Sequence, residues 1–457
     1  MKEIRALSPT GGLGDTPIEK DSFYSGLERD PDFLGADAGS GDIGPVWLGT
    51  DGVHNPREWE KYDLELMLIA ARERDIPMMI GSAGSTGTNK GVNRFVKIIE
   101  EVAREKKLRR FKLAAIYAEV AKDYLEERLS KEEIEGLGTS NLTMEDIDKS
   151  DYIVAMMGIE PYIKALGMGA DVIIAGRSCD DAIFAALPIM EEFPKGLAFH
   201  MGKALECASL VGTPQMIHET MLGTIREDCV LLEPMYPDQI ATPASVAAHS
   251  MYERVDPYTQ GIPGGMLDMH ATKYEQYDQR TTKITGSRFI EDPVCRVKIE
   301  GAGKVGYRAF FIVGIRDPIA IGQMDRILTD AREKVRTEFN ELKESIDYHL
   351  SFHVYGRNGV MGSLETEKKT AHELGIVIEV VAKSDELATA IAKFAKFRGF
   401  FYAQYPGQKN SSGGGAALLV DEVLKPGQSA CRWTINHLLP LDDPLELFPI
   451  KMMEIGY

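Results

Sequence analysis

Apolar and polar residues in the first half of the chain alternate in a way that predicts strands followed by helices. The apolar run at residues 76–80 breaks into a stretch of glycines and hydroxyl side chains at 81–91. Apolar residues then return at helical spacing from Val92 to Val102, which predicts an amphipathic helix. A strand, a loop and a helix in this order form the βα unit of a parallel sheet.

The same rhythm recurs before and after this unit. We therefore predict an α/β domain over residues 1–222, with an open, mainly parallel sheet and flanking helices. Because the carboxyl ends of parallel strands meet at one sheet edge, we expect residues 35–42, 81–88 and 177–181 to lie together. Further strands are predicted at 4–7, 111–120, 153–158 and 170–175 and from Phe33 onward, and further helices at 57–74 and 122–135.

The rest of the chain changes character twice. Residues 223–292 are rich in proline, glycine, tyrosine and threonine, and we interpret them as a connecting segment near the site, with a helix beginning at Pro243. Residues 293–457 predict a smaller C-terminal α+β domain. Its expected elements are a hairpin over 294–315, helices at 324–335 and 385–398, strands at 348–355, 376–381 and 400–405, and a glycine-rich loop at 410–415.

The composition limits the classes of function. Of the 457 residues, 44% are hydrophobic and 27% are charged, which suits two or three ordinary globular domains. No apolar run approaches the roughly 18 residues of a membrane helix, and the first residues lack the apolar core of a signal peptide. We therefore expect a cytoplasmic protein with no membrane partner. The net charge of −18 argues against nucleic acid as a partner.

Acidic residues and one arginine follow the predicted strands and are the catalytic candidates. Asp37 and Asp42 lie among glycines past one strand, Glu160 follows another, and Arg177 and Asp180 occupy the turn after a third. The acids would serve as general acid, general base or metal ligand, and the arginine would bind a carboxylate or phosphate. The alternative is that the aspartates cap turns and that Arg177 pairs with Asp180.

The glycine-rich segment at 81–91 has two open interpretations. The helix that follows it would offer N–H groups and a positive dipole end to an anion. Alternatively, the glycines let the strand pack tightly against the helix. Their three-residue interval matches neither the P-loop nor the dinucleotide fingerprint. The substrate-binding or anion-binding candidates are Gly81, Ser82, Gly84, Ser85, Gly87 and Thr88.

Residue types that bind metals are present without a diagnostic spacing. The five cysteines are scattered and never in C-x-x-C order, which indicates neither a disulfide framework nor a zinc site. Asp51 and His54 would form an oxygen and imidazole set with Asp37 and Asp42, although such spacing is common by chance. The cofactor therefore stays unknown, and a divalent cation is one alternative.

One predicted helix carries polar residues along a single face. His200, Lys203, Glu206 and Cys207 recur at three-residue and four-residue spacing, which places them on the same side of the helix. Such a face is chemically capable if it lies near the site. The commoner case is a solvated surface with a Lys–Glu pair, and we interpret the face in this way.

Five stretches of the chain are distinctive when they are taken together. They are GADAGSGDIGP (35–45), LELMLIAARERDIPMMIGSAG (64–84), GADVIIAGRSCDDA (169–182), ITGSRF (284–289) and INHLLPLDDPLELF (435–448). Together they resemble the acyclic terpene utilisation family, the AtuA-like proteins, over nearly the whole chain. The resemblance implies a two-domain cytoplasmic protein of bacteria or archaea, encoded among catabolic genes for acids and acyl-CoA thioesters. It implies no assigned reaction and no catalytic residues.

The expected function is that of a catabolic enzyme. The glycine loops, the acids and Arg177 favour a hydratase/dehydratase-type lyase that acts on a small carboxylic acid or its acyl-CoA thioester. The alternative is a non-catalytic subunit that binds acyl-CoA or a nucleotide and needs a partner protein. We expect a homo-oligomer, with or without a small partner protein.

Overall fold

The computed structural model describes residues 2–367, 369, 371–409, 417–418 and 428–457. It divides the chain into two compact units, one with residues Met1–Gly303 and Trp433–Tyr457, the other with Lys304–Arg432. These limits differ from the predicted segments 1–222, 223–292 and 293–457. Strands from the predicted connecting segment pair into the large sheet, and the C-terminal residues return to the first unit.

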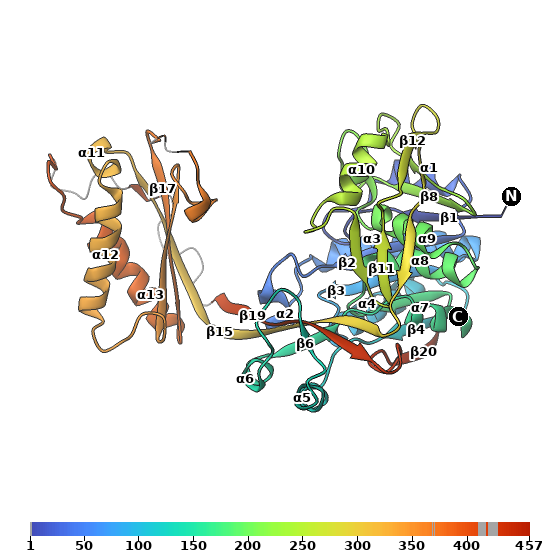
Figure 1. Cartoon of the computed structure of the whole chain (residues 1–457), viewed down its shortest axis with the longest axis horizontal. Helices are drawn as coiled ribbons and strands as arrows, with labels where there is room; N and C mark the ends of the chain where they lie inside the picture. The colour runs from blue at the N-terminus through green and yellow to red at the C-terminus, as the bar shows by residue number, and fades with distance from the viewer. Residues whose placement is uncertain (1, 368, 370, 410–416, 419–427) are drawn as a thin grey trace. The chain divides into compact units, whose positions relative to one another are not determined.

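The first unit is built on a large mixed sheet (Figure 1). Among the described residues, the strands pair in the order β12-β13-β9-β8-β1-β2-β3-β7-β4-β20. The central pairs from β1 to β4 are parallel, as predicted, whereas the pairs outside them are antiparallel. The strands are β1 (Glu3–Ser8), β2 (Phe33–Gly39), β3 (Met78–Ser85), β4 (Phe111–Ile116), β7 (Val172–Ala175), β8 (Met221–Arg226), β9 (Val230–Pro234), β12 (Lys273–Gln276), β13 (Thr282–Thr285) and β20 (Ile450–Ile455).

Helices cover both faces of this sheet. In β7, Val172 and Ile174 belong to the buried cluster that includes residues of α1, α3 and α4, whereas Ile173 and Ala175 belong to the cluster that includes residues of α7, α8 and α9. This alternation follows from the two-residue period of a strand and explains why the central strands are apolar throughout. The helices are α1 (Lys20–Leu27), α2 (Pro45–Gly49), α3 (Arg57–Arg74), α4 (Asn89–Glu105), α5 (Lys122–Ser130), α6 (Met144–Asp148), α7 (Glu160–Gly167), α8 (Asp180–Met190), α9 (Lys195–Leu205) and α10 (Pro243–Met251).

Two helices of the first unit confirm the sequence-based predictions. The helix predicted at 57–74 is α3, and the helix predicted from Pro243 is α10, with Thr242 as its N-cap. The Thr242 hydroxyl accepts a hydrogen bond from the backbone N–H of Ser245, which satisfies one of the unpaired donors at the start of the helix.

Two predictions for the strands are wrong. The run at 153–158 does not join the parallel sheet, because β6 (Tyr152–Ala155) pairs antiparallel with β15 (Cys295–Ile315). The hairpin predicted over 294–315 is this single long strand. The glycines in its middle do not turn the chain but allow close packing, since a Cβ on Gly303 would lie 1.7 Å from the carbonyl oxygen of Lys149. The smaller strands of this unit are β5 (Glu135–Gly136), β10 (Thr259–Ile262), β11 (Gly265–Asp268) and β14 (Arg288–Glu291).

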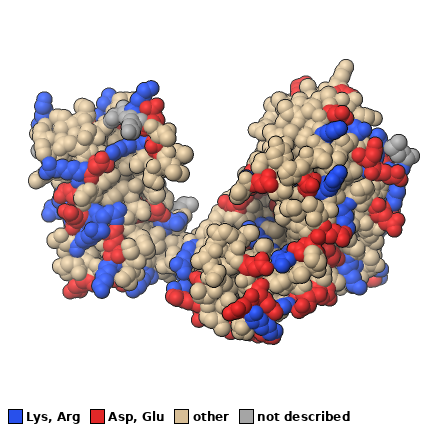
Figure 2. Space-filling model, viewed as in Figure 1, with Lys and Arg blue, Asp and Glu red and all other residues tan. Residues whose placement is uncertain are grey.

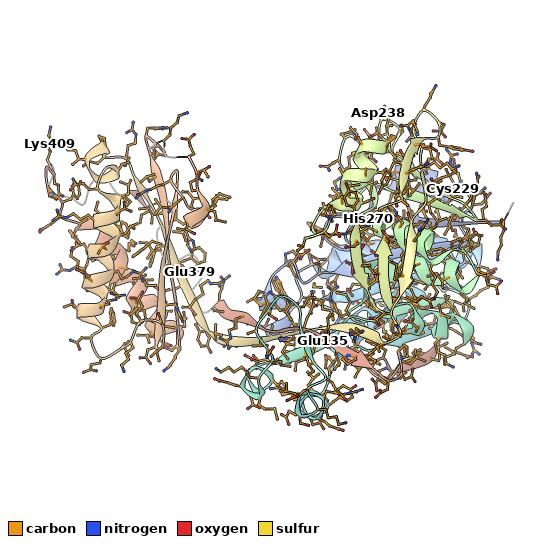
Figure 3. The ribbon with its side chains drawn as sticks, in the orientation of Figure 1. Glu135, Cys229, Asp238, His270, Glu379 and Lys409 are labelled. Carbon is orange, nitrogen blue, oxygen red and sulfur yellow. The ribbon has the colours of Figure 1, made fainter. Side chains whose placement is uncertain are left out.

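The second unit has an antiparallel sheet with helices against it. The end of β15 pairs with β17, and β17 pairs with β16; Glu379 on β17 is labelled in Figure 3. Residues of α12 and α13 join the buried core of these strands. The elements are α11 (Pro318–Ile321), α12 (Met324–Glu338), β16 (Tyr348–Tyr355), β17 (Leu374–Ala382), α13 (Asp385–Phe394), β18 (Ala417–Leu418) and β19 (Gln428–Leu441), the last of which continues into the first unit.

The strand predicted at 400–405 is wrong, because Ala395–Phe401 forms a π-helical turn that continues α13. The predicted glycine-rich loop at 410–415 lies outside the described residues. No helix among the described residues is long and apolar enough to cross a membrane. On the face drawn in Figure 2, described Lys and Arg side chains alternate with Asp and Glu in each unit, without a continuous basic surface there.

The glycines that follow β3 lie in crowded backbone. Gly84 has φ +74°, and a Cβ on it would lie 2.4 Å from the Cα of Gly91 in α4. Because that neighbour is backbone, it cannot move aside as a flexible side chain would. The tight approach of β3 and α4 therefore depends on glycine at this position.

We predict that Gly84→Val lowers the free energy of unfolding by more than about 2 kcal/mol, through positive-φ strain and overpacking. Denaturant unfolding followed by circular dichroism measures the change. Gly167→Ala is the matched control, since a Cβ at Gly167 meets open space, and it should change stability by less than about 1 kcal/mol. A Gly84→Val protein with wild-type stability would contradict the packing role.

Candidate functional site

Three strands of the large sheet end side by side. β2 pairs parallel with β3, and β3 pairs parallel with β7, so their carboxyl ends lie at one edge. The segments past them are joined directly, because Arg177 Nη1 donates to Ser82 Oγ at 3.2 Å. The prediction that these segments share one sheet edge is therefore confirmed. Such an edge is where α/β proteins place their ligands.

Arg177 is the centre of this edge. The residue is 5% exposed, and its Nε donates to Glu300 Oε2 on β15 at 2.8 Å. Its Nη1 also lies 3.5 Å from Asp180 Oδ1, and Glu300 pairs in addition with Lys298 at 2.6 Å. Burial would raise the pKa of Glu300, but Arg177 and Lys298 outweigh it and hold this pKa at about 2. Glu300 is therefore ionised and compensates the buried guanidinium.

Asp37 and Asp180 form an unusual pair of carboxyl groups beside the arginine. Asp37 Oδ1 and Asp180 Oδ1 are buried and accept no hydrogen bond from the described residues. Burial raises the pKa of Asp37 well above its usual value, and the negative charge of Asp180 raises it further. Burial also raises the pKa of Asp180, against the opposing effect of Arg177. Perturbed carboxyl groups of this kind are typical of acid–base chemistry.

Two hollows open at this edge of the sheet. One has a volume of about 450 Å³, and its wall includes both Arg177 and Asp180. The other is smaller, about 80 Å³, and contains Asp37 and the glycine-rich turn that follows β1. Ser40 belongs to both walls, so the two hollows adjoin. The larger hollow is lined by Ser40, Gly41, Asp42, Thr139, Arg177, Asp180, Lys298, Glu300, Trp433 and Asn436.

The other two predicted acids, Asp42 and Glu160, are not part of the buried cluster around Arg177. Asp42 is exposed in the wall of the larger hollow, where its backbone N–H donates to the Ser40 hydroxyl at 3.0 Å. Glu160 begins α7 and lines a separate cavity of about 500 Å³ with Lys195 and Cys295. The structure thus brings Asp37, Arg177 and Asp180 together and leaves Glu160 apart.

Ser82, Ser85 and Thr88 of the glycine-rich segment make internal hydrogen bonds, whereas the Thr86 hydroxyl is buried without a partner among the described residues. Ser85 Oγ accepts from the N–H of His54, and Thr88 caps α4 while it donates to Asp51 Oδ1 at 2.6 Å. The N–H of Asn89 is bound by Glu119 at 2.7 Å. The start of α4 therefore has protein acceptors in the place of an anion. With the crowding at Gly81, Gly84 and Gly87, these contacts favour the packing interpretation.

The polar face of α9 is buried, so its interpretation as a solvated surface is wrong. His200 is 0% exposed, Lys203 5% and Glu206 7%, because α8 and α10 pack against this helix. His200 lies between the Ser287 and Ser250 hydroxyls at 2.7 and 2.9 Å, and burial lowers its pKa to about 3. Lys203 forms an ion pair with Glu206.

Sequence reasoning missed the partners that come from β15. Glu300 and Lys298 precede the glycines that were interpreted as a hairpin turn, which hid the fact that their strand reaches the sheet edge. An acid and a lysine two residues apart on one strand point to the same face, and this was the available signal. The metal set of Asp37, Asp42, Asp51 and His54 does not assemble, because Asp51 binds Thr88 and the His54 ring binds Asn55.

Comparison with protein families gives a match over most of the chain. The family model described as acyclic terpene utilisation family protein AtuA matches residues 4–221 and 223–418. No curated protein and no solved structure matches the chain. The family resemblance is confirmed by this match, which includes four of the five stretches; the stretch at 435–448 lies beyond the matched residues.

We predict that Glu300→Gln destabilises the protein by about 3 kcal/mol at pH 7, because it leaves Arg177 buried without its main counter-charge. Since the folded-state pKa of Glu300 is depressed, its contribution is present above about pH 4.5 and is lost as the pH falls toward 2. The difference between wild type and variant should therefore shrink on acidification.

Denaturant unfolding at several pH values between 3 and 7 tests this prediction. Glu145→Gln is the control, since Glu145 pairs with Lys149 on the exposed surface and should change stability little at any pH. A Glu300→Gln difference that grows on acidification would overturn the assignment.

Proposed function

The chain belongs to the acyclic terpene utilisation family AtuA, and from this membership and the site we propose that it is a catabolic hydratase or dehydratase. Its substrate would be a small carboxylic acid or the acyl-CoA thioester of one. The observation that carries the proposal is the pair Asp37 and Asp180, two carboxyl groups with raised pKa beside Arg177 at the edge of a hollow.

The pair suits the reversible addition of water to a carbon–carbon double bond. Such a reaction needs one group to take a proton from carbon and another to protonate the departing hydroxyl. Two close carboxyl groups tend to share one proton, because like charges resist joint ionisation. Arg177 lies 3.5 Å from Asp180 and favours the charge there. Asp180 is then the base and Asp37 the acid.

The hollow supports a substrate of modest size with a negative or polarised oxygen. A volume of about 450 Å³ holds a short-chain acid or an acyl group, and a longer cofactor arm would extend out of it. Lys298 and Arg177 supply positive charge to its wall, next to the ring of Trp433. An enolate-like oxygen would be stabilised by such cations.

The setting of the reaction is proposed with it. A cytoplasmic location is supported by the five cysteines, which are scattered along the sequence and never in C-x-x-C order, as suits a protein of a reducing compartment. We also propose a homo-oligomer, with or without a small partner protein. Apolar side chains gather on the exposed loop after β16, where Val360 is 82% and Leu364 72% exposed. Exposed apolar loops of this kind often mark contacts between chains.

We predict that Asp37→Asn and Asp180→Asn each lower turnover by on the order of a hundredfold or more, with little change in melting temperature. Asparagine keeps the size and most hydrogen bonds of aspartate but carries no proton to transfer. Turnover is measured on a panel of hydroxy acids and enoyl-CoA esters, with and without Mg²⁺, by the absorbance of the conjugated double bond.

Asp171→Asn is the matched control. Asp171 precedes β7 and binds the N–H of Lys112, at the sheet edge opposite to Asp180, so its variant should retain activity. Full turnover in both site variants would remove the pair from the mechanism. A wild-type protein that binds CoA esters in calorimetry but converts none of them would instead identify the non-catalytic binding subunit.

We predict a solution mass that is a multiple of 50.5 kDa, measured by light scattering after size exclusion. Replacement of Val360 and Leu364 by lysine should shift the mass toward one chain, because charges at an apolar contact are costly to bury. A wild-type protein of single-chain mass would contradict the homo-oligomer.

A further inference from the structure

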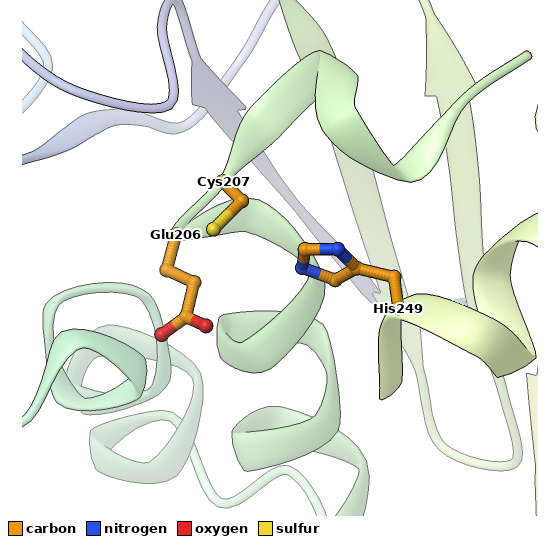
Figure 4. Close-up of side chains that lie close together, drawn as sticks. All are labelled: Glu206, Cys207 and His249. Carbon is orange, nitrogen blue, oxygen red and sulfur yellow. The ribbon is translucent and has the colours of Figure 1, made fainter. Parts of the chain in front are cut away.

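Three side chains of different chemistry converge between α9 and α10. Glu206 caps the C-terminus of α9, Cys207 follows it, and His249 lies in the last turn of α10. One ligand atom from each lies within 4.8 Å of the other two, and Figure 4 shows the imidazole ring directed at the thiol and the carboxylate. From this convergence we infer a binding site for a divalent transition-metal cation of the Zn²⁺ type. The inference does not depend on the proposed reaction.

The state of His249 is the independent observation behind the inference. The side chain is 8% exposed, and its Nε2 is buried without a hydrogen-bond partner among the described residues. The ring is hydrogen-bonded to the backbone of Lys203. Because Nε2 has no partner, Nδ1 is the ring atom that makes this hydrogen bond. A neutral imidazole that donates from Nδ1 presents the Nε2 lone pair, and metal-binding histidines are commonly fixed in this way.

A buried nitrogen lone pair with no partner is costly. Leaving a buried acceptor unsatisfied typically costs about 1–3 kcal/mol, and native proteins contain few such groups. A cation between His249 and Cys207 would satisfy this lone pair directly. The position is therefore better explained by a ligand than by packing.

The donor set selects the class of cation. A nitrogen, a sulfur and an oxygen donor suit Zn²⁺ and related transition metals, whereas Mg²⁺ and Ca²⁺ prefer oxygen alone. Three protein ligands leave a fourth tetrahedral position open. On binding, the Cys207 thiol loses its proton to solvent, so that thiolate and carboxylate together neutralise the two charges of the ion.

The surroundings fit a metal site after a small adjustment. Donor atoms around tetrahedral Zn²⁺ lie roughly 3.5 Å apart, so the three side chains must close by about 1 Å. Lys203 is paired with Oε1 of Glu206, and Asp181 is a second side-chain partner of this carboxyl group, which the ion would displace. The hydroxyl of Tyr252 lies 3.4 Å from Cys207 Sγ and would donate to the thiolate as an outer partner.

Metal binding to the full-length protein tests the site. The protein is stripped with a chelator and dialysed, and Zn²⁺ is then titrated against a competing chromophoric chelator. Co²⁺ is added in a parallel experiment, because a thiolate ligand gives it a charge-transfer absorption band. We expect one equivalent of tightly bound Zn²⁺, a thiolate–cobalt band, and protection of Cys207 from alkylation by iodoacetamide when Zn²⁺ is bound.

Cys207→Ser and His249→Gln should each lower Zn²⁺ affinity by more than about tenfold, and Cys207→Ser should also abolish the cobalt band. Cys229→Ala is the matched control: Cys229 is a buried cysteine in the turn between β8 and β9 (Figure 3), and its variant should bind like wild type. Circular dichroism confirms that each variant is folded.

The inference is overturned by any of three results. The first is that the stripped wild-type protein binds no stoichiometric Zn²⁺. The second is that both ligand variants are folded and keep wild-type affinity. The third is that the cobalt band is lost in Cys229→Ala and kept in Cys207→Ser. If either ligand variant is unfolded, the alkylation experiment on the wild-type protein tests the site instead. Equal alkylation of Cys207 with and without Zn²⁺ would then reject the site.

Discussion

The guanidinium of Arg177 is the constraint on which the sheet edge depends. A charge that is 5% exposed requires compensation, because an unpaired buried ion is strongly destabilising. Glu300 supplies the compensating charge from β15, and Ser82 and the carbonyl of Ser178 accept the Nη1 protons. These contacts join the carboxyl ends of β3 and β7 to the first third of β15. They also hold Ser82 at φ +49°, a conformation that a non-glycine residue adopts only when its surroundings enforce it.

The glycines after β3 serve the same constraint. The N–H of Arg177 donates to the carbonyl of Gly87 at 3.1 Å, and a Cβ on Gly87 would lie 2.1 Å from that nitrogen. Glycine at 87 is therefore what lets the two backbones meet and sets the position of the arginine. A segment rich in glycine and hydroxyl groups can thus belong to a functional edge without touching a ligand, since its role is to place the residues that do.

The elements that depend on local pattern were predictable, and those that depend on distant partners were not. The amphipathic spacing at 57–74 and the capping residues before Pro243 decide those helices locally. Parallel pairing then places Asp37, Arg177 and Asp180 at one edge, which the strand pattern predicts. Glu300 was missed, because nothing near it in sequence shows that its strand pairs with β6 and then continues through glycines to β17. The face of α9 was misjudged because its cover, α10, lies some 45 residues later, so that burial was invisible from local polarity.

Two neighbouring residues at the start of α8, Asp180 and Asp181, belong to two different clusters of buried charged side chains. Successive helical residues point about 100° apart, so Asp180 and Asp181 face different partners. Asp180 pairs with Arg177. The charged form of Asp181 is stabilised chiefly by Lys203, which also pairs with Glu206. The charges are not independent, since Glu206 and Lys203 both influence the pKa of Asp180. In a buried setting such interactions are screened little by solvent or salt. The protonation of the carboxyl pair at the sheet edge is therefore set partly by charge on α9, and any change of charge there acts on both clusters.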